Sequence, residues 1–280
     1  MSLFTNFSKV SCDSVTSIAI GGFDGLHKGH QELFSRLDKG GAVLAIENNH
    51  MDLTPKRERE NFCKYPFFYL ELDSVMKLSG REFVELLEKT FVNLKRVVVG
   101  YDFKFGNNRS CDAIDLISMF AYEVVIVNEV KVDGISVHSR NIRNYIRLGE
   151  IQKANKLLGR EYLIQGEIIK GQGLGMRKLY PTLNLEVKRY LIPNEGVYAT
   201  TTKVDDKLYP SVSFIGHRVS TDGSFAVETH ILIEDEDFSC EAAEIIFVEK
   251  MRDNRYFDKL EDLKAQISQD IADAKRALLL

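Results

Sequence analysis

The sequence contains no tryptophan and only five prolines and four cysteines among its 280 residues. The four cysteines lie far apart and form no CxxC pair, which excludes a disulfide framework and the usual zinc-binding patterns. No apolar run approaches the roughly 18 residues that a membrane-spanning helix requires. The N-terminus also lacks the basic and apolar regions of a secretory signal. We therefore expect a cytoplasmic protein with reduced thiols and no membrane partner.

The sequence also lacks an excess of basic residues. Its 37 lysines and arginines are outnumbered by 41 aspartates and glutamates, giving a net charge of −4. A groove for nucleic acid needs a basic face, so we expect no nucleic-acid partner. The length allows two domains, whereas the oligomeric state cannot be read from the sequence.

The first half alternates between strand-like and helix-like segments. Strands are predicted at Ile18–Gly22, Val43–Ile46, Phe67–Leu72, Arg96–Gly100 and Val124–Val127. Helices are predicted at His30–Leu37, Arg81–Phe91 and Asp112–Phe120. This alternation is typical of a parallel sheet covered on both faces, which binds ligands beyond the carboxyl ends of its strands.

A helical region from Ser139 to Leu158, broken near Gly149, precedes a change in the pattern. Short β-rich runs separated by turn residues then predict a small antiparallel barrel. They cover Tyr162–Ile169, Thr182–Val187, Val197–Val204, Tyr209–Ile215, Phe225–Ile233 and Glu244–Val248. An amphipathic stripe from Phe257 onward predicts a C-terminal helix that packs on the barrel. We expect two domains, 1–158 and 159–280.

The most informative segment is Gly21–His30. Two glycines end the first strand, and two histidines, His27 and His30, stand where a helix begins. The free N–H groups of a helix N-terminus attract anions, so added imidazoles indicate a site for phosphate chemistry. The alternative is an ordinary strand-to-helix turn with incidental histidines.

The same segment resembles the Gly-x-Phe-Asp-Gly-x-His-x-Gly-His signature of the nucleotidyltransferase superfamily, in the form found in prokaryotic bifunctional riboflavin kinase/FMN adenylyltransferases. The resemblance implies a Rossmann-like nucleotidyltransferase domain with a parallel sheet, followed by a small antiparallel β-barrel riboflavin kinase domain with a C-terminal helix. It implies catalytic roles for His27 and His30. It also implies that nucleotide or flavin is bound by Gly22, Phe23, Asp24 and Gly25.

Two further segments of the first half share this resemblance. Gly100–Arg109 is similar to the family's Gly-x-Asp-Phe-x-Phe-Gly-x-x-Arg segment and implies ligand binding by Asp102, Phe103 and Arg109. The segment around Ser139 and Arg143 is similar to an Ile-Ser-Ser-Thr-x-Ile-Arg element that contacts the triphosphate. Cys111, His138 and Arg140 depart from the family's pattern. For Gly100–Arg109, a loop with a structural salt bridge and two core phenylalanines is the alternative.

The second half resembles the riboflavin kinase module. A glycine-rich phosphate loop is implied at Gly171, Gly173 and Gly175, and Mg²⁺ ligands at Thr182 and Asn184, whose oxygens suit that ion. Glu228 corresponds to the catalytic base, and Arg252 begins the closing motif that the helix completes. Leu179 replaces a family glycine, and Val219-Ser220 replaces a Pro-Thr pair. A solvent-facing strand glutamate is the alternative for Glu228.

The implied function is synthesis of flavin cofactors, with riboflavin, FMN and ATP as the small-molecule substrates and Mg²⁺ as cofactor. The barrel would phosphorylate riboflavin to FMN, and the first domain would adenylylate FMN to FAD with release of pyrophosphate. One alternative is an FMN adenylyltransferase with a degenerate kinase-like domain. A different adenylyl- or cytidylyltransferase and a non-catalytic flavin-binding protein are the others.

Overall fold

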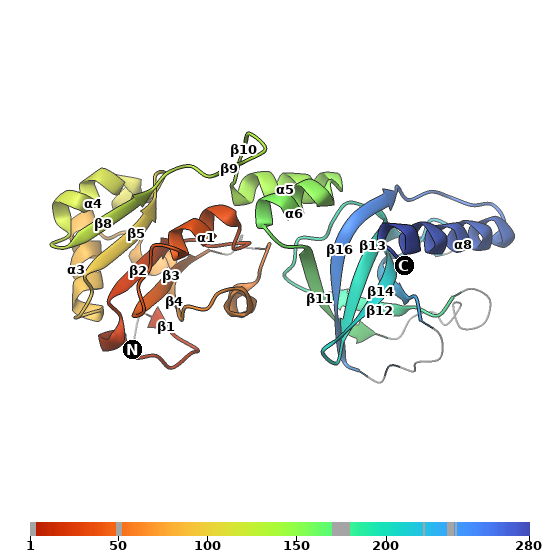
Figure 1. Cartoon of the computed structure of the whole chain (residues 1–280), viewed down its shortest axis with the longest axis horizontal. Helices are drawn as coiled ribbons and strands as arrows, with labels where there is room; N and C mark the ends of the chain where they lie inside the picture. The colour runs from red at the N-terminus through yellow and green to blue at the C-terminus, as the bar shows by residue number, and fades with distance from the viewer. Residues whose placement is uncertain (1–3, 49–51, 170–179, 221, 234–237, 239) are drawn as a thin grey trace. The chain divides into compact units, whose positions relative to one another are not determined.

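The computed structural model describes residues 4–48, 52–169, 180–220, 222–233, 238 and 240–280. Its contacts divide the chain into two compact units, Met1–Ser139 and Arg140–Leu280, drawn in Figure 1. Among the described residues, no helix has both the length and the apolar character needed to cross a bilayer.

The first unit is built on a six-stranded sheet, ordered β1-β4-β3-β2-β5-β8 (Figure 1). The parallel strands are β2 (Ser17–Gly21), β3 (Gly41–Glu47), β4 (Phe67–Glu71), β5 (Arg96–Gly100) and β8 (Glu123–Val127), and β1 (Phe4–Thr5) is antiparallel to β4. The chain runs from β2 outward to β4 and then returns to β5 on the other side of β2. This change of direction creates a switch point between β2 and β5, where such sheets bind ligands.

Both faces of this sheet are covered, as the alternating pattern predicts. On β2, Ile18 and Ile20 pack into a cluster with Phe83 and Leu87 of α3 (Gly80–Thr90). Ala19 faces the opposite cluster, with residues of α1. The other helices of this unit are α1 (Lys28–Phe34), α2 (Leu72–Val75), α4 (Ala113–Met119) and the 3₁₀ turns η1 (Cys12–Ser14), η2 (Lys56–Phe62) and η3 (Asn107–Arg109). The predicted parallel sheet is therefore confirmed.

Two short hairpins of this unit are absent from the sequence prediction. One pairs β6 (Lys104–Phe105) with β7 (Cys111–Asp112), and the other pairs β9 (Lys131–Val132) with β10 (Ile135–Ser136). Strands of two residues are too short to produce a periodic pattern.

A helix pair, α5 (Ser139–Leu148) and α6 (Ile151–Leu158), lies in the second unit, except that the first residue of α5, Ser139, belongs to the first unit. Gly149 separates them with a φ of 76°, a left-handed conformation that glycine adopts without strain. The Asn155 side chain ties α6 to the barrel, because it donates to the Phe247 carbonyl at 2.9 Å and accepts from the Tyr162 N–H at 2.8 Å.

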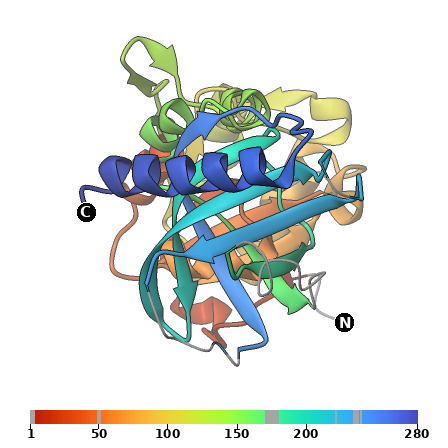
Figure 2. The same cartoon turned by 90° about the vertical axis from the view of Figure 1, so that its right-hand side faces the viewer.

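The rest of this unit is a closed antiparallel barrel, ordered β11-β12-β15-β14-β13-β16. Its strands are β11 (Tyr162–Ile169), β12 (Leu183–Val187), β13 (Gly196–Val204), β14 (Lys207–His217), β15 (Phe225–Ile231) and β16 (Ala242–Arg252). The helix α8 (Leu260–Ala277) lies across it, as Figure 2 shows, with Ala274 packed on Val197 and Ala199. The predicted barrel and C-terminal helix are confirmed.

The barrel interior contains a ring of five hydroxyl groups. They belong to Thr200, Thr202, Ser211, Ser213 and Thr229, none of which is exposed. Each hydroxyl lies 2.8–2.9 Å from two others, so the ring satisfies its own hydrogen bonds. Because Thr229 points inward, its neighbours on β15, Glu228 and His230, point out of the barrel.

Candidate active sites

The turn after β2 is held in an uncommon backbone conformation. Phe23, Gly25 and Leu26 have φ angles of 53°, 85° and 45°. The side chains of Phe23 and Leu26 are both 1% exposed, so core packing stabilises a backbone that non-glycine residues rarely adopt. The turn places His27 at the N-cap of α1, beyond the carboxyl end of β2 at the switch point of the sheet.

His27 and His30 form a stacked pair. Their ring centroids lie 3.5 Å apart, and the backbone N–H of His30 donates to Nδ1 of His27 at 3.3 Å. A neutral His27 therefore carries its proton on Nε2. Gly29 permits this packing, because a Cβ there would lie 3.1 Å from the His27 ring and 3.3 Å from the Val137 carbonyl. The predicted pair is thus brought together.

His30 carries an unsatisfied nitrogen. Its Nδ1 is buried and has no hydrogen-bond partner among the described residues. Burial, and then the charges of His27, Arg59 and His138, hold the pKa of His30 well below its ordinary value. A neutral imidazole with an unpaired ring nitrogen is suited to bind a ligand.

Asp24 holds the turn through its own hydrogen bonds. Its buried carboxylate accepts from the backbone N–H groups of Leu53 and Thr54, at 3.1 and 3.0 Å. Its carbonyl accepts from the Ser139 hydroxyl at 2.8 Å. The structure therefore joins Asp24 and Ser139, and it directs the Asp24 side chain to the chain segment around Thr54.

A buried ion pair that the sequence does not reveal supports the same turn. Arg59 is 0% exposed and pairs with Glu47. Its guanidinium also donates to the carbonyls of Gly22 and Thr54, at 3.2 and 3.0 Å. Arg59 lies in a polar run that reads as a solvated surface, so no periodic signal marks it as buried.

The segment after β5 contributes residues of two kinds. Phe103 packs against Phe105 in the core and is only 9% exposed, which fits the alternative of a structural role. Asp102 and Arg109 are exposed, and the Arg109 side chain makes no hydrogen bond or ion pair among the described residues, although its backbone N–H donates to the Gly106 carbonyl at 2.9 Å. Arg109 follows Asn108, and both have positive φ, at 57° and 54°.

His138, a departure from the family's pattern, contacts this segment. Its Nε2 lies 3.2 Å from the hydroxyl of Tyr101, the residue that follows β5. Ser139 begins α5, and Arg143 lies in the next turn of that helix, in the second unit. The structure thus joins His138 to the end of β5, whereas a triphosphate contact by Arg143 stays a prediction.

The barrel brings Asn184 and Glu228 together. They are direct partners on the neighbouring antiparallel strands β12 and β15, so their side chains leave the sheet on the same face. Arg218 binds both, donating to Asn184 Oδ1 at 2.7 Å and to Glu228 Oε1 at 2.9 and 2.6 Å. No role for Arg218 is predicted from the sequence.

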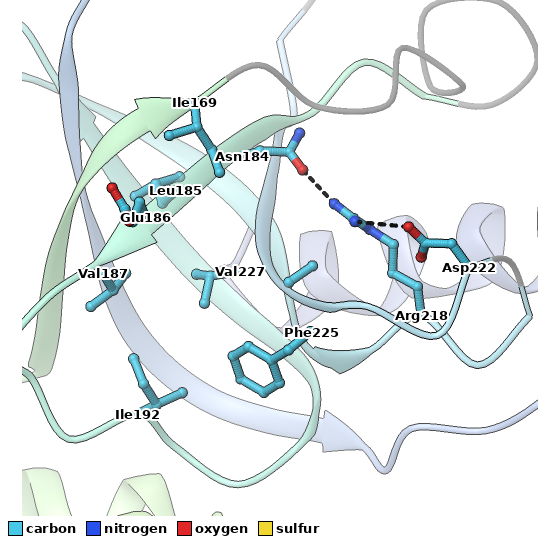
Figure 3. A pocket seen from close by; sticks show the side chains of 11 residues that line it. Ile169, Asn184, Leu185, Glu186, Val187, Ile192, Arg218, Asp222, Phe225 and Val227 are labelled. Carbon is cyan, nitrogen blue, oxygen red and sulfur yellow. Dashed lines mark hydrogen bonds and ion pairs between the residues drawn. The ribbon is translucent and has the colours of Figure 1, made fainter.

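A cavity of about 360 Å³ opens beside this group (Figure 3). Asn184, Arg218 and Asp222 form its polar end. Its apolar part was not predicted from the sequence, and it is lined by Ile169, Val187, Ile192, Phe225 and Val227. A small apolar cavity with a few convergent polar groups is typical of a ligand site.

The segment before β12 is held from two sides. His230 bonds the Pro181 carbonyl through Nδ1 at 2.7 Å, and the Tyr180 hydroxyl lies 3.0 Å from the Ser268 hydroxyl on α8. Thr182 follows directly and is exposed. The glycines predicted to bind phosphate, Gly171, Gly173 and Gly175, lie outside the described residues.

Arg252 anchors α8 to the barrel. It forms two hydrogen bonds with the buried Asp270, at 2.8 and 2.7 Å. The Arg252 guanidinium therefore has a structural role, and its contact with a ligand stays a prediction.

Comparison with known proteins finds a matching family model in each of the two units. The FAD synthetase family model matches residues 42–141, and the riboflavin kinase family model matches residues 158–278. A bifunctional riboflavin kinase/FMN adenylyltransferase of Pseudomonas fluorescens is 30% identical, over 92% of this chain and 91% of its own length. The chain belongs to this bifunctional family.

Another member of the riboflavin kinase/FMN adenylyltransferase family and a solved structure are similar to this chain along most of their length. The Escherichia coli K12 protein is 26% identical, with 90% of each chain covered. A solved structure described as a macrolide-efflux protein from Streptococcus pneumoniae has a TM-score of 0.83 and 28% identity, with 96% of this chain and 97% of that chain covered. The architecture of this family member is therefore shared with a solved structure across both units.

Proposed function

We propose that this chain catalyses two consecutive reactions of flavin cofactor synthesis. The barrel converts riboflavin and ATP to FMN and ADP, and the parallel-sheet unit converts FMN and ATP to FAD and pyrophosphate. The observation that carries the proposal is that each unit holds its own polar site. One contains the His27–His30 pair at the switch point, and the other contains Glu228 in register with Asn184.

In the parallel-sheet unit, a phosphate oxygen of FMN attacks the α-phosphorus of ATP, and the bond to the β-phosphate breaks to release pyrophosphate. Such chemistry depends on positioning and charge stabilisation more than on a covalent nucleophile. The Nε2–H of His27 donates to a phosphate oxygen, and His30 contributes its unpaired nitrogen. Gly22, Phe23 and Gly25 shape the turn around them.

Other predicted residues complete this site as ligand-binding groups. Arg109 is suited to phosphate, because its guanidinium is exposed and has no partner within the described structure. Asp102 and Phe103 are assigned to the flavin side, with Phe103 presenting only a small exposed edge. Ser139 and Arg143 are assigned to the triphosphate.

In the barrel, Glu228 takes the proton of the terminal ribityl hydroxyl as that oxygen attacks the γ-phosphorus of ATP, and ADP leaves. The cavity of about 360 Å³ beside Arg218 offers space and apolar side chains for a nucleotide base. Gly171, Gly173 and Gly175 are assigned to the phosphates of ATP, and Arg252 to the flavin side.

Thr182 and Asn184 would hold Mg²⁺. Both supply neutral oxygen donors at the start of β12, and the amide oxygen of Asn184 has a second lone pair beyond its bond to Arg218. When bound, the ion would neutralise charge on the transferred phosphate.

The second candidate is an FMN adenylyltransferase with a degenerate kinase-like barrel. The altered segment between Gly175 and Thr182 favours it. Against it, the barrel keeps Asn184 and Glu228 side by side, and the riboflavin kinase family model matches the whole module.

Two variants separate the two reactions. His27→Ala/His30→Ala should lower FAD formation from supplied FMN by at least about 10²-fold, the effect of losing preorganised donors. Glu228→Gln should lower FMN formation by about 10²- to 10⁴-fold, the usual contribution of a general base. Each variant should retain the other activity, and a parallel loss of both activities in either variant would contradict the two-site assignment.

We also propose residues 1–158 and 159–280 as the two domains. The riboflavin kinase match begins at residue 158, which supports this boundary. The contacts within the structure instead place α5 and α6 in the same unit as the barrel. Limited proteolysis followed by mass spectrometry locates the boundary.

A cytoplasmic location is proposed as well, supported by four free cysteines and by the substrate ATP.

A further inference from the structure

Arg218 lies at the centre of the barrel site and contacts groups from three segments. Its guanidinium donates to Asn184 on β12, to Glu228 on β15 and to the Ser224 hydroxyl in the intervening turn, the last at 2.8 Å. Asp222 of the same turn lies 3.9 Å away (Figure 3). The Arg218 side chain is 18% exposed and that of Glu228 is 22% exposed, so both charges are largely removed from water.

The two oxygens of Glu228 differ in their contacts. Both bonds from Arg218 reach Oε1, through Nε and Nη2. Oε2 has no hydrogen-bond partner within the described part of the chain. The guanidinium therefore fixes the orientation of the carboxylate through one oxygen and leaves the other able to accept a proton.

The backbone around Arg218 is itself fixed. Its N–H donates to the Ser224 carbonyl at 2.9 Å, and its carbonyl accepts from the Gly223 N–H at 3.1 Å. Asp222 accepts from the N–H and the hydroxyl of Ser224. The turn between β14 and β15 thus holds the arginine that in turn orients Glu228.

We propose that Arg218 is the positioning residue for riboflavin phosphorylation: it aligns Glu228 Oε2 with the substrate hydroxyl and holds Asn184 beside it. This inference rests on the proposed kinase function of the barrel. Arginine is required because its planar fork serves several acceptors at once, whereas the single ammonium of lysine offers no such fork.

The test measures riboflavin phosphorylation by the full chain with Arg218→Met and Arg218→Lys. Arg218→Met should lower kcat about tenfold to hundredfold, the effect of losing one or two charge-assisted hydrogen bonds, with both KM values within about threefold of wild type. The kcat of Arg218→Lys should lie between those of the wild type and Arg218→Met. FAD formation from supplied FMN depends on the other unit and should stay unchanged. The circular dichroism spectrum and thermal unfolding of each variant, compared with the wild type, show whether the barrel itself is folded.

Arg276→Met is the matched control, because it removes an arginine that pairs with Asp273 on the exposed side of α8. It should match the wild type in both reactions. A wild-type kcat in Arg218→Met, or a raised KM for ATP with kcat unchanged, would overturn the positioning role. So would unfolding of both Arg218 variants, since Arg218 would then be purely structural. If the wild type forms no FMN, the proposed kinase function fails instead.

Discussion

At the residue scale, the first candidate site contains two imidazoles that pack on each other. His27 is 5% exposed and caps α1, while His30 keeps an unpaired ring nitrogen. The sequence predicted this pair, because glycines, histidines and the start of a helix fall together within ten residues. It could not predict that the Asp24 carboxylate binds Leu53 and Thr54, since that contact joins residues about 30 positions apart.

The lowered pKa of His30 predicts that stability depends on pH. Unfolded histidine has a pKa of about 6.5, so as the pH falls below that value the unfolded chain binds a proton that folded His30 does not. The free energy of unfolding should therefore fall between pH 6.5 and the lower folded pKa, by at most about 1.4 kcal/mol per pH unit for this group.

His30→Asn should reduce this slope, which denaturant titrations from pH 7 to pH 5 measure. Burial also lowers the pKa of His230, so a smaller dependence on pH should remain in the variant. An identical slope in the variant and the wild type would show that His30 titrates normally.

At the element scale, β-branched runs and helical periodicity located the long strands and helices. The two-residue strands were missed because they carry no period. Arg59 of η2 was missed as well, because its neighbours Lys56–Glu60 are all charged and read as a solvated segment. Asn184 and Glu228 were predicted individually, but the arginine that joins them was not, because a β14–β15 turn contact has no sequence pattern.

Replacing the buried Arg59 alone should strongly lower the free energy of unfolding. Arg59→Met would leave the buried Glu47 carboxylate without its partner and should cost about 3–5 kcal/mol of unfolding free energy. The double variant Arg59→Met/Glu47→Leu should recover much of that loss, since no buried charge remains. Chemical denaturation measures the unfolding free energy of both variants. An equal loss of unfolding free energy in the single and double variants would contradict this explanation.

At the scale of the whole molecule, each unit has its own core and its own candidate site. The ring of buried hydroxyls and the helix α8 stabilise the barrel, and the two apolar clusters stabilise the parallel sheet. The sequence predicted both architectures, because a period of two residues and alternating strands and helices are visible along the chain. The grouping of α5 and α6 with the barrel depends on tertiary contacts such as those of Asn155.

The most direct test of the account follows FMN and FAD separately while the wild-type chain acts on riboflavin, ATP and Mg²⁺. We predict that FMN appears first and that FAD then forms from it, with one pyrophosphate released for each FAD. FAD formation from supplied FMN, but no FMN from riboflavin, would contradict the claim that one chain carries both activities.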